Sequence, residues 1–175
     1  SSLGTKAIDA ILKFKKPTDI SLHLLENGDP LSIESILKNI NKEDTIFIVI
    51  SKSGTTIETT SIFKYVLNRY DIDLNSNDTS RLIMITDYES PLYQFGQKYS
   101  IATFSIPKNV GGRFSVLSAV GLVPLAILGY DIQKLIDGAS NLEKDFFNKK
   151  HHHLLEKGYY YFKQAKKKPM NVLFS

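Results

Sequence analysis

Apolar positions along the chain follow two spacings, and each spacing predicts one type of secondary structure. Short runs of β-branched and aromatic residues are typical of strands, whereas apolar residues three or four positions apart are typical of helices. Strands are predicted at residues 20–25, 45–50, 82–85, 101–106 and 171–174. Helices are predicted at residues 3–16, 31–40, 55–70, 91–99, 116–128, 131–147 and 151–167.

The order of these elements favours an α/β fold. Because strands alternate with helices, we expect a three-layer sandwich in which a mostly parallel sheet carries helices on both faces, with Rossmann-like topology. The run at 45–50 is apolar enough to be buried on both faces of such a sheet. Ligands of these folds bind at the carboxyl ends of the strands, so functional chemistry is expected in the segments that directly follow them.

The segment "SKSGTT" at residues 51–56 directly follows the strand predicted at 45–50. Its serine and threonine hydroxyls can donate hydrogen bonds, and Gly54 allows a tight turn. The next helix would direct free N–H groups and its positive dipole end at this loop. The pattern predicts an oxyanion cradle for a small phosphate ester, since the Walker and GxGxxG spacings of nucleotide sites are absent. The alternative is that the hydroxyls merely cap the helix, which needs only one or two of them.

The segment "NVGGRFS" at residues 109–115 places Arg113 between two glycines and the apolar helix predicted at 116–128. Arginine is not the default cation of this chain, which has three arginines and nineteen lysines. A fixed guanidinium with five donors suits a negative charge that develops on oxygen during a reaction. The alternative is a structural arginine that holds the loop in place.

Composition and charge narrow the functional classes. The absence of cysteine excludes disulfides and thiolate metal sites, and is compatible with a cytoplasmic protein. The longest apolar stretch, 114–130, is shorter than the roughly 20 residues of a membrane span. Residues 149–168 hold seven lysines and one acid, while the whole chain carries +4. This uneven charge argues against a uniform nucleic-acid surface and favours a solvated helix face over an anion-attracting one. No metal site is expected at His151–His153, because consecutive residues do not share one helix face.

Three motifs resemble those of one enzyme family. "SKSGTTIET" resembles the phosphosugar-binding loop of the sugar isomerase (SIS) fold, and "VGGRFSVLSAVGLVPLAILGYDI" is similar to the signature of the glucose-6-phosphate isomerase family. "SSLG" at residues 1–4 resembles the tail of that family's Gly-Gly-Ser-x-Leu-Gly turn. The motifs occur in family order over nearly the whole chain. The resemblance therefore implies a first SIS subdomain at 1–170, without its first strand, and the start of a second subdomain at 171–175.

The resemblance also implies roles for individual residues. Arg113 would stabilise the enediolate during exchange between glucose 6-phosphate and fructose 6-phosphate, a step of glycolysis and gluconeogenesis that needs no metal or other cofactor. The family's glutamate base and ring-opening histidine lie in motifs without a match here, so this chain alone is expected to be inactive. Substrate-binding roles are implied for Ser1, Ser51, Lys52 (through its backbone), Ser53, Thr56 and Gly112.

Two other functions remain open at this point. A non-catalytic SIS module that senses a sugar phosphate would have a similar Ser/Thr-rich loop, and so would the SIS domain of glucosamine-6-phosphate synthase. "GGRFS" favours the isomerase, and the helix-turn-helix expected of a regulator is not found. The resemblance implies a cytoplasmic homodimer that binds neither nucleic acid nor membranes; no feature of the sequence tests the extracellular signalling reported for some family members.

Overall fold

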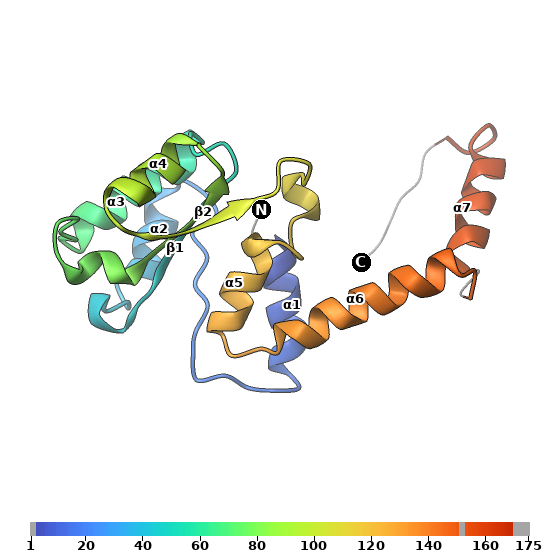
Figure 1. Cartoon of the computed structure of the whole chain (residues 1–175), viewed down its shortest axis with the longest axis horizontal. Coiled ribbons are helices and arrows are strands. Elements are labelled where there is room, and N and C mark those ends of the chain that lie inside the picture. Colours follow the sequence, from blue (N-terminus) through green and yellow to red (C-terminus); the bar gives the residue numbers. More distant parts are fainter. Residues whose placement is uncertain (1–2, 151–152, 170–175) are drawn as a thin grey trace. The chain divides into compact units, whose positions relative to one another are not determined.

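The computed structural model describes residues 3–150 and 153–169. The chain divides between Tyr130 and Asp131 into two compact units, of which the first holds the sheet (Figure 1). The domain boundaries expected from the sequence stay a prediction. The strand predicted at 171–174 lies outside the described residues.

The first unit is built on a parallel sheet of three strands in the order β1-β2-β3. These strands are β1 (Phe47–Ser51), β2 (Leu82–Asp87) and β3 (Ala102–Ile106). Ile85 of the central strand aligns with Ile50 of β1 and Phe104 of β3. The central strand is buried at most positions, whereas β1 is mostly half-buried because it has only one neighbour among the described strands. The prediction that β1 is buried on both faces is thus met only in part.

One face of the sheet packs against α2 (Pro30–Leu37), α3 (Ile57–Arg69) and α4 (Pro91–Lys98). Met84 is fully buried in this core, and the rings of Phe63 and Phe95 meet edge to face at 5.7 Å. Short 3₁₀ turns, η1 (Lys42–Asp44) and η2 (Asn77–Arg81), precede β1 and β2.

The other face packs against α5 (Ala119–Ile127), which lies beside α1 (Leu3–Lys13) in Figure 1. Because Pro124 has no N–H, the carbonyl of Val120 lacks its usual partner within the helix. The buried hydroxyl of Thr5 donates to that carbonyl at 3.5 Å, so α1 compensates at the point where proline interrupts α5. The expected parallel α/β sheet with helices on both faces is confirmed.

The strand predicted at residues 20–25 is wrong, since this segment forms no regular secondary structure. Leu25 packs directly against the first core, and the amide of Ile20 bonds the Thr18 hydroxyl rather than a strand. The weak alternation therefore reflects single apolar contacts of a connecting segment and no sheet pairing.

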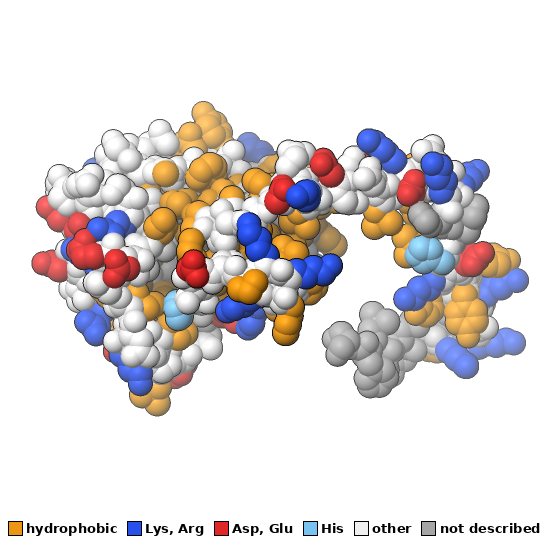
Figure 2. Space-filling model, turned by 90° about the horizontal axis from the view of Figure 1, so that it is seen from below, with side chains coloured by type: hydrophobic (Ala, Val, Ile, Leu, Met, Phe, Trp, Pro, Cys, Tyr) orange, Lys and Arg blue, Asp and Glu red, His pale blue; other side chains and the backbone are white. Residues whose placement is uncertain are grey.

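The second unit contains α6 (Ile132–Phe147) and α7 (His153–Gln164). The predicted cap is confirmed, because the Asp131 carboxylate accepts a hydrogen bond from the Lys134 amide at 3.1 Å. Neither helix has a buried residue among those described, and Figure 2 shows lysine and apolar side chains together over α7. Within the described part of the chain, no helix is long and apolar enough to cross a membrane.

Gly121 provides a test of the close packing at the start of α5. A Cβ at this position would lie 2.1 Å from the carbonyl oxygen of Val116, which is backbone and cannot swing away. We expect Gly121→Ala to lower the free energy of unfolding by about 1–3 kcal/mol, measured by urea denaturation. Gly28→Ala is the control, because nothing lies within 4 Å of its Cβ. Equal stability of the two variants would show that the turn before α5 is not tightly packed.

Candidate functional site

The loop after β1 carries a connected network of hydroxyl groups. Ser51 is buried and donates to the Thr56 hydroxyl at 3.1 Å, and the Ser53 hydroxyl lies 3.4 Å from the same oxygen. Ser53 also accepts hydrogen bonds from the amide and the hydroxyl of Thr55, at 3.2 and 3.1 Å. The hydroxyl groups of "SKSGTT" are therefore held together at the carboxyl end of β1, as the sequence predicts.

Gly54 is required by the geometry of this loop. Its φ of 69° lies in the left-handed region, where other residues are strained. A Cβ there would lie 2.8 Å from the hydroxyl oxygen of Ser90 and 2.9 Å from the amide nitrogen of Leu92. The predicted tight turn is thus confirmed, and it lets the loop approach the start of α4 closely.

Helix α3 begins without a side-chain cap. Thr56 occupies the capping position, but its side chain makes no capping hydrogen bond. Helices α2, α4, α5 and α6 are capped by side chains, in order those of Asp29, Ser90, Ser118 and Asp131. The simple capping interpretation of the loop is therefore wrong for Thr56. The first-turn amides of α3 and the positive end of its dipole face a site rich in hydroxyl donors.

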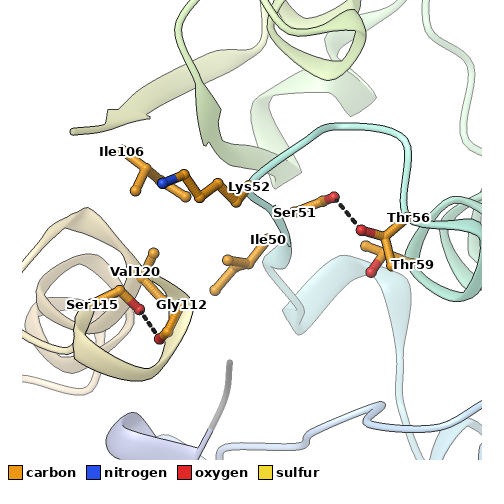
Figure 3. A pocket seen from close by; sticks show the side chains of 9 residues that line it. All are labelled: Ile50, Ser51, Lys52, Thr56, Thr59, Ile106, Gly112, Ser115 and Val120. Atoms are coloured by element: carbon orange, nitrogen blue, oxygen red, sulfur yellow. Dashed lines mark hydrogen bonds between the residues drawn. The ribbon is translucent and has the colours of Figure 1, made fainter. Parts of the chain in front are cut away.

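A cavity of about 180 Å³ joins this loop to the second motif (Figure 3). Ser51, Lys52 and Thr56 line it from one side, and Gly112 of the 3₁₀ turn η3 (Gly112–Phe114) lines it from the other. The apolar part of the lining is formed by Ile50, Ile106 and Val120. Because pockets for drug-sized ligands measure roughly 300–1,000 Å³, this cavity suits a smaller molecule.

Not every predicted residue reaches the cavity. Ser53 is exposed and contacts Thr56 without lining the cavity itself. Arg113 is exposed in η3, next to Gly112, and bonds no described residue. Ser1 lies outside the described residues. The roles implied for these residues remain predictions.

Two polar lining residues were missed from the sequence. Thr59 follows Thr56 by three positions, so its place on the same helix face could have been inferred. Ser115 is buried and donates to the Gly112 carbonyl at 2.6 Å, which shapes η3. The spacing of "GGRFS" gives no sign that this serine turns toward the cavity.

Two charged residues of the loop and of α3, Lys52 and Glu58, lie at different places around the site. Glu58, in the first turn of α3, lines a separate groove with Ile33 and Tyr65 and does not line the cavity. Lys52 is the charged residue of the cavity lining, and its Nζ donates to the carbonyls of Lys108 and Val110 at 2.9 and 2.7 Å. Among the residues that the structure describes, no cluster of histidine, aspartate and glutamate side chains could hold a metal ion.

Fold and site together define an α/β domain with a small, partly hydroxyl-lined cavity at the carboxyl edge of a parallel sheet. Comparison with known families identifies the family to which this domain belongs. The sequence model of a family described as "Phosphoglucose isomerase" matches residues 1–155, and the chain belongs to this family.

Individual relatives agree with this family. The glucose-6-phosphate isomerase of Campylobacter jejuni is 41% identical over 147 residues, which cover 84% of this chain and 36% of that protein. The crystal structure of a hypothetical protein from Thermus thermophilus matches with a TM-score of 0.73 and 36% identity, covering 79% of this chain and 33% of that one. A glucose-6-phosphate isomerase structure from Chlamydia trachomatis matches with a TM-score of 0.63 and 30% identity, covering 70% and 23%.

These matches also show how long the chain is relative to its relatives. It covers 32% to 36% of the length of the curated relatives it matches.

Thr56→Ala separates a binding role from a capping role. Since the Thr56 side chain does not cap α3 but accepts a hydrogen bond from the buried Ser51 hydroxyl, we expect the free energy of unfolding to fall by about 0.5–1.5 kcal/mol. Binding of inorganic phosphate, followed by NMR titration, should weaken by about 1.5–3 kcal/mol because a hydrogen bond to a charged group is lost.

Asp29→Ala is the matched control, because Asp29 caps α2 through the Ser32 amide at 2.8 Å. It should cost about 0.5–2 kcal/mol of stability and leave phosphate binding unchanged. If Thr56→Ala were destabilised like Asp29→Ala and bound phosphate normally, Thr56 would be a structural residue only.

Proposed function

We propose that this chain forms the phosphate-binding part of the active site of an aldose–ketose isomerase that interconverts glucose 6-phosphate and fructose 6-phosphate. One observation carries the proposal. The hydroxyl network at the uncapped start of α3 and the glycine–arginine segment meet at a single small cavity. The names of the relatives support this reaction over a different sugar-phosphate chemistry.

The 6-phosphate is assigned to the loop after β1. The hydroxyls of Ser51, Ser53 and Thr56 can rotate from one another to the phosphate oxygens, since each hydroxyl both donates and accepts. The backbone of Lys52 and the first amides of α3 add donors, and the helix dipole favours the negative charge. This end of the site holds the substrate without taking part in bond breaking.

The reacting end is assigned to the segment around η3. Moving a proton between C2 and C1 places negative charge on the sugar oxygens, and a guanidinium beside them stabilises that charge more than it stabilises the neutral sugar. Gly112 lines the cavity and Arg113 follows it directly, with no protein partner among the described residues to hold it away. Ser1, at the start of the chain, is assigned to the substrate pocket together with Gly112.

The remaining catalytic groups come from other parts of the enzyme. The base that carries the proton and the residue that opens the sugar ring belong to motifs that this sequence does not match. We assign the whole enzyme to glycolysis and gluconeogenesis in the cytoplasm, as a homodimer. The net reaction transfers a proton and oxidises nothing overall, so the proposal includes no cofactor.

Arg113→Ala tests the reacting end in the protein expressed at the length its gene encodes. Loss of an oxyanion donor should raise the activation barrier by roughly 2.7–4 kcal/mol, seen as a fall in kcat with little change in KM. Arg69→Ala is the control, since Arg69 is a surface residue of α3 whose Nε lies 3.9 Å from Glu34. A normal kcat for Arg113→Ala would remove the enediolate role.

An assay of the 175-residue chain alone tests whether the catalytic base lies in another part of the enzyme. We expect it to bind inorganic phosphate but to show no interconversion of glucose 6-phosphate and fructose 6-phosphate in a coupled assay, because the base is absent. Measurable turnover by the purified chain would contradict the assignment of the base to another part of the enzyme.

A further inference from the structure

The side chain of Lys52 connects the two motifs of the site. Lys52 directly follows β1, and its ammonium group donates to the carbonyls of Lys108 and Val110, which are 56 and 58 residues further along the chain. These acceptors lie after β3, on the far side of the central strand. Figure 3 shows the Lys52 nitrogen beside Ile106, whereas the Ser51 hydroxyl points the other way, to Thr56.

Lysine is chemically suited to this link. An ammonium group has three donors and no acceptor, so it can satisfy two carbonyl oxygens at once, and its charge strengthens both hydrogen bonds. The segment that it reaches also contains a turn, in which the Val110 amide donates to the Pro107 carbonyl at 3.0 Å. Gly112, two residues after Val110 in the same segment, lines the cavity.

Asp87, the last residue of β2, fixes the backbone of Lys52. Its amide donates to the Lys52 carbonyl at 3.0 Å, a hydrogen bond that lies beyond the last β1–β2 pair of Ser51 and Thr86. The Lys52 backbone is thus held at the end of β2, while its side chain reaches the segment after β3.

We propose that Lys52 is a positioning residue whose side chain holds the segment 107–111 and thereby places Arg113 beside the substrate. This inference rests on the proposed isomerase function. The phosphate is then held by the Lys52 backbone and the neighbouring hydroxyls, and the Lys52 ammonium serves the reacting end. Substrate binding at one motif and catalysis at the other are linked through this one side chain.

Lys52→Met tests the proposal in the protein expressed at the length its gene encodes. Methionine keeps the unbranched shape and removes the donors, so we expect kcat to fall by up to roughly 100-fold through misplacement of Arg113. Inhibition by inorganic phosphate should change less than about threefold, because the phosphate donors are intact. Lys52→Arg should recover part of kcat, since a guanidinium can also reach two carbonyls. Lys64→Met, an exposed lysine of α3, is the control.

A double variant distinguishes positioning from general damage. If Lys52 acts through Arg113, then Lys52→Met combined with Arg113→Ala should be no slower than Arg113→Ala alone. Additive losses would overturn the proposal, and so would a normal kcat for Lys52→Met. A rise in the phosphate inhibition constant with kcat unchanged would identify Lys52 as an anion ligand, which also overturns it.

Amide hydrogen exchange tests, without any assay of turnover, whether the Lys52 side chain holds the segment 107–111. Exchange at residues 107–115 should be faster in Lys52→Met than in the wild-type protein, and Lys52→Arg should restore part of the protection. Unchanged exchange in this segment would overturn the proposal that the Lys52 side chain holds it. An inactive wild-type protein would contradict the proposed function alone, and the exchange result would still decide the role of Lys52. If Lys52→Met does not fold, Lys52→Gln, which removes the charge and shortens the side chain, takes its place: unchanged kcat and unchanged exchange in this variant overturn the proposal.

Discussion

Parallel pairing of β2 with both of its neighbours is the constraint on which the rest of the structure depends. Because the three strands run in the same direction, the segments that follow them leave from one edge of the sheet. Leu82, Met84 and Ile85 of β2 are fully buried, and together they contribute to both faces, so a shift of register would expose apolar side chains on both. The register that the core imposes therefore also decides which loops meet at the cavity.

At that edge, helix α3 begins without a side-chain cap. An uncapped helix start normally costs about 1 kcal/mol, and α3 begins uncapped while the hydroxyls of the preceding loop bond one another. The loop is held by other means, including the left-handed conformation of Gly54. The Thr86 hydroxyl donates to the Lys52 carbonyl at 3.3 Å and lies 2.7 Å from that of Ser90. The start of α3 therefore departs from the side-chain capping seen at α2, α4, α5 and α6.

The sequence predicts those features that local patterns encode. Buried strands are visible as β-branched runs, and "SKSGTT" is recognisable because four hydroxyls and a glycine at the end of a strand exceed what a cap needs. Features that depend on distant backbone atoms could not be predicted. One example is the hydrogen bond from the Lys52 ammonium to the Val110 carbonyl. Another is the hydrogen bond from the Thr5 hydroxyl to the Val120 carbonyl, which Pro124 leaves without a partner in the helix. The false strand at 20–25 has the same origin, because Leu25 packs on a core built by other segments. The division after Tyr130 is also invisible, since α6 and α7 have ordinary amphipathic patterns.

The central claim is that the phosphate binds at the start of α3 while the chemistry takes place beside η3. A crystal structure of the intact protein with fructose 6-phosphate tests it most directly. We expect phosphate oxygens about 2.5–3.0 Å from the hydroxyls of Ser51 and Thr56, with C1 and C2 of the sugar next to Gly112 and Arg113. A phosphate bound away from this loop, or a sugar turned with its reacting carbons toward α3, would contradict this division of the site.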